Sequence, residues 1–69
     1  MERTELKLFR IRQKLTQEQI AEKLGYSRGH YARFENGEAD TTLRFLQALQ
    51  TAFNITFTEA QTLMIRDKK

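Results

Sequence analysis

The chain has 69 residues, the size of one small domain with a modest hydrophobic core. It contains no cysteine, which excludes disulfide bonds and thiolate zinc sites, and no proline, which favours uninterrupted helices. No run approaches the roughly 18 apolar residues of a membrane span, and no signal-peptide core is visible, so we expect a cytoplasmic protein. We interpret residues 1–69 as one domain, with a core of about residues 5–65 and a charged tail at 66–69.

The formal net charge of +3 is unevenly distributed along the chain. Residues 1–37 carry eight Lys or Arg against five Glu, whereas residues 38–69 carry four charges of each sign. A nucleic-acid partner bound by the first half would favour this distribution. The alternative is that a weakly basic surface only keeps the protein in solution.

A first helix is expected over about residues 3–14. Its apolar positions form two stripes: Leu6 and Phe9, and Leu8, Ile11 and Leu15. Two stripes favour a helix wedged between two neighbours, as is common in small bundles. The alternative is that Leu8 or Ile11 is exposed for a partner.

The segment from Thr16 to Gly37 predicts two short helices joined by a tight turn. Thr16 and Gln19 have capping-box spacing, and Ser27 is a good N-cap for the next helix. Gly25 and Gly37 are placed where helices end in a left-handed residue. Two N-caps and two C-terminal glycines all predict the same two helices. This segment is therefore the most informative part of the chain about function.

The second of these helices, about residues 28–35, has two different faces. Tyr31 and Phe34 are three residues apart and are expected to face the core, where the Tyr31 hydroxyl needs a partner or water. Arg28 and Arg33 point elsewhere. The helix before it buries Ile20, Ala21 and Leu24 at helical spacing.

The rest of the chain predicts two more helices. After a polar loop at residues 38–41, one helix runs over about residues 42–53, with Asp40, Thr41 or Thr42 as its N-cap and Asn54 as its left-handed stop. Its buried face is expected to be Leu43, Leu46, Leu49 and Phe53, flanked by Phe45 and Ala52.

A fifth helix is expected to end near Ile65. Two capping-box pairs could begin it: Thr56 with Glu59, or Thr58 with Gln61. Residues 66–69 are interpreted as a frayed tail. The expected fold class is therefore all-α, with five short helices and no strand.

With these elements in place, the sequence resembles the phage repressor/Cro-type, or XRE-like, helix-turn-helix family. The matching residues are Arg10, Leu15, Thr16, Gln17, Ile20, Ala21, Leu24, Gly25, Ser27, Glu35, Asn36 and Gly37, followed by the pattern Leu43, Leu46, Leu49, Ala52, Phe53, Asn54, Ile55 and Thr56. The resemblance covers about residues 5–65 and implies a compact five-helix bundle that binds DNA.

The resemblance also implies roles for individual residues. The expected base contacts, on the recognition helix at about residues 28–35, are Ser27, Arg28, Gly29 and Arg33. The phosphate contacts that the resemblance implies are Gln17 and Asn36. From their charge and position alone, His30 and Arg44 are further expected phosphate contacts; for His30, an idle exposed side chain is the alternative. Arg10 and Glu35 match a structural ion pair between the first and third helices.

Two positions depart from the family pattern. Gly29 replaces a polar base-reading side chain; close approach of the backbone to DNA and a tolerant helix start remain open as explanations. The loop after Gly37 carries Glu38 and Asp40 where relatives often have basic residues, with only Arg44 to offset them. Acidic groups beside phosphates lower affinity, so we expect modest DNA binding by a monomer.

These features predict a sequence-specific transcriptional regulator of prokaryotic or phage origin that binds double-stranded operator DNA, most simply as a homodimer. The expected dimer surface is Phe57, Leu63, Met64 and Ile65.

The rival interpretation is a protein-interaction module on the same scaffold, such as an anti-repressor or antitoxin-like modulator. Neither interpretation requires a cofactor, a metal or enzymatic activity, because the sequence has one histidine, no cysteine nucleophile and no glycine-rich phosphate loop.

Overall fold

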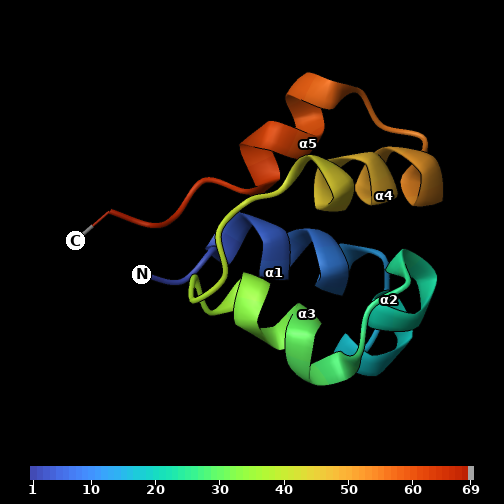
Figure 1. The fold of residues 1–69 in the computed structure, drawn as a ribbon, viewed down its shortest axis with the longest axis horizontal. Coiled ribbons are helices and arrows are strands. Elements are labelled where there is room, and N and C mark those ends of the chain that lie inside the picture. Colours follow the sequence, from blue (N-terminus) through green and yellow to red (C-terminus); the bar gives the residue numbers. More distant parts are fainter. Residues whose placement is uncertain (69) are drawn as a thin grey trace.

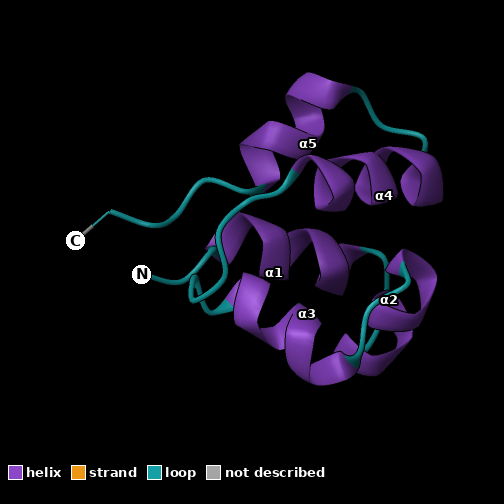
Figure 2. Cartoon of the chain, viewed as in Figure 1, coloured by secondary structure: helices purple, strands orange, loops and turns teal. Residues whose placement is uncertain are grey.

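The structure, a computed structural model, describes residues 1–68, and all regular structure in these residues is helical (Figure 2). In chain order the helices are α1 (Thr4–Arg12), α2 (Gln17–Leu24), α3 (Arg28–Glu35), α4 (Leu43–Phe53) and α5 (Phe57–Leu63). In Figure 1, α1 lies in the middle of the molecule, with α2 and α3 on one side and α4 and α5 on the other. The expected all-α fold and order of helices are confirmed.

The helix ends follow the predicted caps closely. Thr16 and Thr56 each form a complete capping box, which selects Thr56 over Thr58 as the start of α5. The hydroxyl of Thr42 accepts a hydrogen bond of 3.1 Å from the Phe45 N–H, so Thr42 is the N-cap of α4. Gly25 at φ 80° and Asn54 at φ 53° end α2 and α4 in the left-handed region. These boundaries are therefore set by local chemistry.

The core lies where the five helices meet, and aromatic rings fill its centre. The ring centroids of Phe34 and Phe45 are 3.9 Å apart in a stacked arrangement, and Tyr26 meets both rings at 5.3–5.6 Å. The buried apolar residues are Leu6, Ile20, Ala21, Leu24, Tyr31, Phe34, Phe45, Leu46, Leu49, Ala60 and Met64. The core thus draws on every helix and fixes α3 from its inner side.

The expected buried face of α4 is wrong at one position. Leu43 is 61% exposed, whereas Phe45, expected only to flank the core, is fully buried. Two residues apart, these side chains lie about 160° apart around the helix and cannot both face inward. The stacking of Phe45 on Phe34 sets the rotation of α4, and Leu43 is turned to solvent.

Helix α1 lies between α3 and α5, as expected of a wedged helix, but most of its second stripe does not take part in that packing. Leu6 is fully buried and Phe9 packs edge-on against Phe53, with ring centroids 5.0 Å apart. Leu8 and Ile11 lie on the opposite side of the helix and are 37% and 49% exposed. Leu15, the third residue of that stripe, is partly buried against the core, so only Leu8 and Ile11 are left on the surface.

The end of the chain differs from the expectation in two ways. Helix α5 ends at Leu63, and Met64 packs into the core, so Met64 is excluded from the expected dimer surface. Residues 66–68 are not a frayed tail, because Asp67 is held against the N-terminal residues: its N–H donates to the Glu2 carbonyl at 2.7 Å, and its carboxylate accepts from the Thr4 N–H at 3.0 Å. Lys69, which the interpretation included in the tail, lies outside the described residues.

Candidate nucleic-acid interface

Helices α2 and α3 are joined by a short turn that the sequence defines residue by residue. Gly25 adopts the left-handed conformation, and the Tyr26 N–H returns to the Ala21 carbonyl at 2.9 Å. The Ser27 hydroxyl then accepts from the His30 N–H at 3.1 Å and begins α3. This arrangement is a helix-turn-helix, in which the second helix is presented on the surface.

Helix α3 separates its side chains into an inner and an outer face. Tyr31 and Phe34 are buried, as predicted. Arg28, Gly29 and Arg33 are exposed. The two guanidinium groups are neither turned inward nor covered by other elements, and they leave a basic surface on α3 that a DNA groove could receive.

Below that surface, Glu35 accepts hydrogen bonds from three helices. Arg10 Nε donates to Glu35 Oε2 at 2.6 Å, the Tyr31 hydroxyl donates to the same oxygen at 2.7 Å, and Gln17 Nε2 donates to Oε1 at 3.2 Å. The predicted ion pair of Arg10 and Glu35 is present. Glu35 is also the hydrogen-bond partner that the buried Tyr31 hydroxyl was expected to need. Arg10 also donates through Nη1 to the Leu15 carbonyl at 2.9 Å. The end of α3 is thereby joined to α1 and α2.

This network also determines how Glu35 titrates. Burial alone would raise the pKa of Glu35, but the hydrogen bonds from Arg10, Tyr31 and Gln17 outweigh burial and hold the pKa below its ordinary value. Burial, followed by the interaction with Glu35, raises the pKa of Tyr31 well above its ordinary value. Glu35 is therefore an anion and Tyr31 a neutral donor at neutral pH.

Gln17 lies beside two depressions that contain other predicted contact residues. One, of about 600 Å³, is lined by Arg10, Thr16, Gln17, Glu18, Gln19 and Arg28. The other, of about 210 Å³, is lined by Glu2, Arg3, Thr4, Lys7, Arg10, Gln17, Glu35 and Asn36. The fold thus brings Gln17 next to Arg28 on one side and next to Asn36 on the other. One Gln17 amide hydrogen is used by Glu35, which leaves the second for another acceptor.

Lys7 is a candidate that sequence reasoning missed. It is exposed on α1 and lines the same depression as Gln17 and Asn36. Lys7 lies on α1, outside the helix-turn-helix, and its neighbours in the sequence do not indicate a DNA contact. Lys7 and Asn36 come from helices far apart in sequence, and only the packing of α1 against α3 places them together.

The remaining predicted phosphate contacts lie in different surroundings. The exposed ring of His30 stacks on Phe34 with centroids 5.2 Å apart and meets Tyr26 edge-on at 4.9 Å. The guanidinium of Arg44 lies over the Tyr26 ring at 5.2 Å. His30 is thus exposed but held by its aromatic neighbours, and Arg44 is oriented by a cation–π contact.

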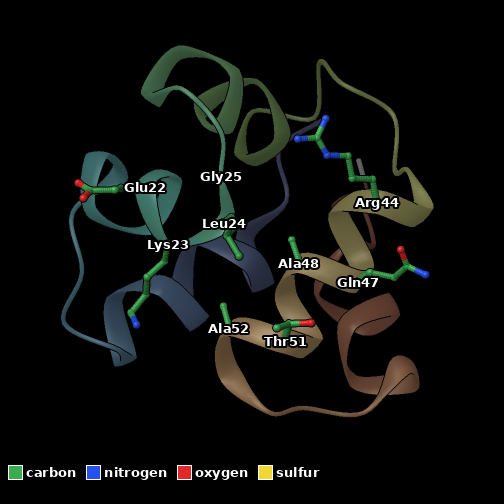
Figure 3. Close-up of a pocket in the computed structure, with 9 residues that line it drawn as sticks. All are labelled: Glu22, Lys23, Leu24, Gly25, Arg44, Gln47, Ala48, Thr51 and Ala52. Carbon is green, nitrogen blue, oxygen red and sulfur yellow. The ribbon is translucent and has the colours of Figure 1, made fainter.

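Arg44 borders a separate groove between α2 and α4, away from Gln17 and Asn36. The groove measures about 420 Å³ and is lined by Glu22, Lys23, Leu24, Gly25, Arg44, Gln47, Ala48, Thr51 and Ala52. Figure 3 shows Leu24, Ala48 and Ala52 pointing toward one another, while the Lys23 and Arg44 side chains extend away from them. The floor of this groove is apolar, and its charged groups do not converge on one point.

Two arginines missed by sequence reasoning hold the loop that follows α3. Arg3 is 1% exposed and donates through Nη1 to the carbonyls of Phe34 and Ala39, both at 2.7 Å. Arg66 Nη2 pairs with Asp40 Oδ1 at 2.8 Å. The expectation that only Arg44 offsets the acidic loop is therefore wrong, because tertiary structure brings Arg66 to it. Nothing in the local sequence distinguishes Arg3 or Arg66 from an ordinary surface arginine.

Gly29 has no structural requirement in the free protein. A Cβ atom built there would meet no heavy atom within 4 Å, in contrast to Gly37, where a side chain would collide with the Met1 carbonyl. Glycine within a helix costs about 0.5–1 kcal/mol relative to alanine. The reason for glycine at this exposed position therefore lies outside the packing of the fold.

Within residues 1–68, no helix is long and apolar enough to cross a membrane. In the same part of the chain, no group of three or more His, Cys, Asp and Glu residues is arranged to hold a metal ion.

Comparison with known proteins identifies the arrangement. Residues 6–59 match the family model described as helix-turn-helix, which spans α1 to α4 and the beginning of α5. Searches of curated proteins and of solved structures give no significant match. The matched range, the capped turn between α2 and α3 and the exposed face of α3 together show that the chain belongs to the XRE-like helix-turn-helix family of DNA-binding regulators.

Proposed function

We propose that this protein is a sequence-specific transcriptional regulator of the repressor/Cro type, which inserts α3 into the major groove of operator DNA. The observation that carries the proposal is the division of α3 into two faces. Tyr31, Phe34 and Glu35 are buried, while Arg28, Gly29 and Arg33 are exposed. A rigid helix with an unobstructed basic face has the shape and charge that the major groove accepts.

Arg28 and Arg33 are the proposed base-reading residues, with Ser27 beside them at the N-cap. A guanidinium can donate two hydrogen bonds to guanine O6 and N7, worth about 1–3 kcal/mol of discrimination. Five residues apart, the two arginines are rotated by about 140° around the helix. Arg28 lies at the N-terminus of the recognition helix, the end that contacts base edges in helix-turn-helix complexes. We therefore assign base reading first to Arg28, with Arg33 on a neighbouring base or on phosphate.

The proposed contacts to the DNA backbone flank α3. Gln17 and Asn36 line one depression together with Lys7, so an amide, a second amide and an ammonium group could meet a single phosphate region. His30 and Arg44 lie on the side of α3 near Tyr26 and are proposed as outlying phosphate contacts. Backbone contacts of this kind fix the register of the protein on DNA but carry no sequence information.

We further propose that two copies bind half-sites one helical turn apart, roughly 34–36 Å. Of the residues expected at the dimer surface, Phe57 and Ile65 are 41% and 60% exposed, and Leu63 is half-buried. Met64 belongs to the core. The proposed dimer contact therefore rests on Phe57 and Ile65, with Leu63 contributing its exposed part.

The decisive experiment is selection of bound sequences from a random pool of duplex DNA at two salt concentrations. A palindromic consensus with half-sites one turn apart supports the proposal in full. Fluorescence anisotropy on the selected site then compares Arg28→Ala and Arg33→Ala with Arg12→Ala, a matched exposed arginine on α1. Loss of affinity and specificity only in the α3 variants supports base contacts by Arg28 and Arg33. Unchanged binding by both variants would exclude such contacts.

The exposed stripe of α1 favours a second candidate function. Leu8 and Ile11 leave apolar surface on the opposite side of α1 from its packed face. A protein-interaction module, such as an anti-repressor or antitoxin-like partner, would use such a surface. The variant Leu8→Lys separates the two functions: if it abolishes binding of a co-purified protein while DNA binding survives, the interaction function gains support.

A further inference from the structure

The loop at residues 37–40 is held from two sides by arginines that are distant in sequence. From beneath, the buried Arg3 donates to the Ala39 carbonyl at 2.7 Å. From the outside, Arg66 Nε donates to the Gly37 carbonyl at 3.0 Å, and its Nη2 donates to the Asp40 carboxylate at 2.8 Å. One guanidinium of the C-terminal segment therefore bridges a backbone carbonyl and a side chain of the same loop.

The position of Arg66 does not depend on that bridge alone. The neighbouring residue Asp67 is hydrogen-bonded to the Glu2 carbonyl and to both the backbone N–H and the hydroxyl of Thr4. Figure 1 shows the C-terminal segment passing beside the N-terminus and near the loop between α3 and α4. The chain direction is thus fixed immediately after Arg66, so its side chain is directed at the loop.

The bridge contributes little to stability. The Asp40 side chain is 91% exposed and that of Arg66 is 41% exposed, and ion pairs in solvent contribute little to folding. Its location is more informative, because the loop follows directly after Asn36. If the loop approaches the DNA backbone, as the proposed function assumes, Asp40 would place an uncompensated negative charge there in the absence of Arg66.

We propose that Arg66 is a positioning residue for DNA binding, which holds the loop at residues 37–40 in its bound shape and offsets the charge of Asp40 next to the phosphates. The inference rests on the proposed function, since it assumes that Asn36 and this loop face DNA. Arg66 acts through Gly37 and Asp40 and does not itself touch a phosphate. Arg66 lies outside residues 6–59, the range that matches the family model, and would offset part of the negative charge of a loop inside that range.

The first test compares three variants on the DNA selected for the wild-type protein. Arg66→Ala is expected to weaken binding about two- to fivefold, the effect of one exposed charge near a phosphate. Lys68→Ala removes the same charge two residues further along and is expected to change binding less than Arg66→Ala. Arg66→Lys keeps the charge but cannot donate to Gly37 and Asp40 through one planar guanidinium group, so its affinity is expected to fall between those of the wild type and Arg66→Ala. Equal effects of Arg66→Ala and Lys68→Ala, or full activity of Arg66→Lys, would overturn the proposal.

The second test asks whether Arg66 acts through Asp40. In an Asp40→Asn background there is no carboxylate to offset, so Arg66→Ala is expected to cause a smaller loss of affinity than in the wild type. A loss of equal size in both backgrounds would show that Arg66 acts on DNA independently of Asp40, and would overturn the positioning role.

A third measurement uses the free protein and needs no DNA. Amide hydrogen exchange at Gly37, Glu38 and Ala39 is expected to be faster in Arg66→Ala than in Lys68→Ala, with exchange in α2 unchanged as evidence that the fold is intact. Unchanged exchange in the loop would contradict the bridge. If the wild-type protein selects no DNA sequence, the proposed function fails; if it does and the Arg66 variants behave like Lys68→Ala, only this inference fails.

Discussion

Arg10 on α1 and Glu35 at the end of α3 are joined by a bond of 2.6 Å between Nε and Oε2, and both side chains are largely removed from solvent. The same carboxylate accepts from Tyr31 and Gln17. The pair therefore connects the recognition helix to α1 and α2. Its role is structural and does not require DNA to be bound.

Replacing Arg10 with methionine is expected to destabilise the free protein by about 3 kcal/mol, because it leaves the Glu35 carboxylate buried without its cation. Urea unfolding followed by circular dichroism measures the change. The double variant Arg10→Met/Glu35→Gln serves as the control and should recover part of the loss, since no unpaired charge then remains. A single variant as stable as the wild type would contradict this account.

The same carboxylate predicts how stability depends on pH. The pKa of Glu35 is lower in the folded protein than its ordinary value of 4.5, so the unfolded chain takes up the proton first. The stabilisation is complete above the ordinary value and is lost as the pH falls through the folded pKa. We expect the stability difference between wild type and Glu35→Gln to shrink as the pH falls below about 4.5.

Thermal unfolding of both proteins across that range tests the prediction. The carboxylates Asp40, Glu59 and Asp67, whose pKa values are also lowered, are present in both proteins and cancel in the difference. A difference that does not change with pH would exclude Glu35 as the titrating group.

Gly25 and Gly29 are expected to respond to alanine with opposite signs. Gly25→Ala should destabilise the protein by about 1 kcal/mol, because φ 80° is unfavourable for a residue with a Cβ. Gly29→Ala should stabilise it by about 0.5–1 kcal/mol, because the site is helical and open. Urea unfolding of both variants measures this; destabilisation by Gly29→Ala would reveal a packing role that the structure lacks.

The effect of Gly29→Ala on DNA binding is a separate prediction. If the α3 backbone approaches DNA at Gly29, the added methyl group should weaken binding to the selected site even though the free protein becomes more stable. Anisotropy titrations of the wild type and the variant at one salt concentration decide the matter. Unchanged affinity would leave the tolerant helix start as the explanation for this glycine.

Lys7 is expected to contact a phosphate and to carry no sequence information. Lys7→Ala should weaken binding to the selected site and to unrelated DNA by the same factor, and should reduce the slope of log affinity against log salt by about 0.9. Arg12→Ala, which removes a charge from another side of α1, is the control. A change in specificity in Lys7→Ala would place the ammonium group on a base instead.

The sequence by itself determined where α2 and α3 begin, where α2 and α4 end, and which face of α3 is buried. Caps such as Thr16 and Ser27 bond to residues three positions away, and Gly25 and Asn54 end helices through their own backbone conformation. The inward direction of Tyr31 and Phe34 follows from helical spacing alone. These features depend on neighbours within one or two turns, which the sequence displays directly.

Only the tertiary structure decided how each helix is rotated and which distant residues meet. The stacking of Phe45 on Phe34 turned Leu43 outward, and the packing of α1 through one face left Leu8 and Ile11 exposed. Arg3 became a buried residue, and Arg66 reached Asp40, because the two ends of the chain come together beside the loop. Helical periodicity fixes which residues share a face, but the direction in which that face points is set by all the packed elements together.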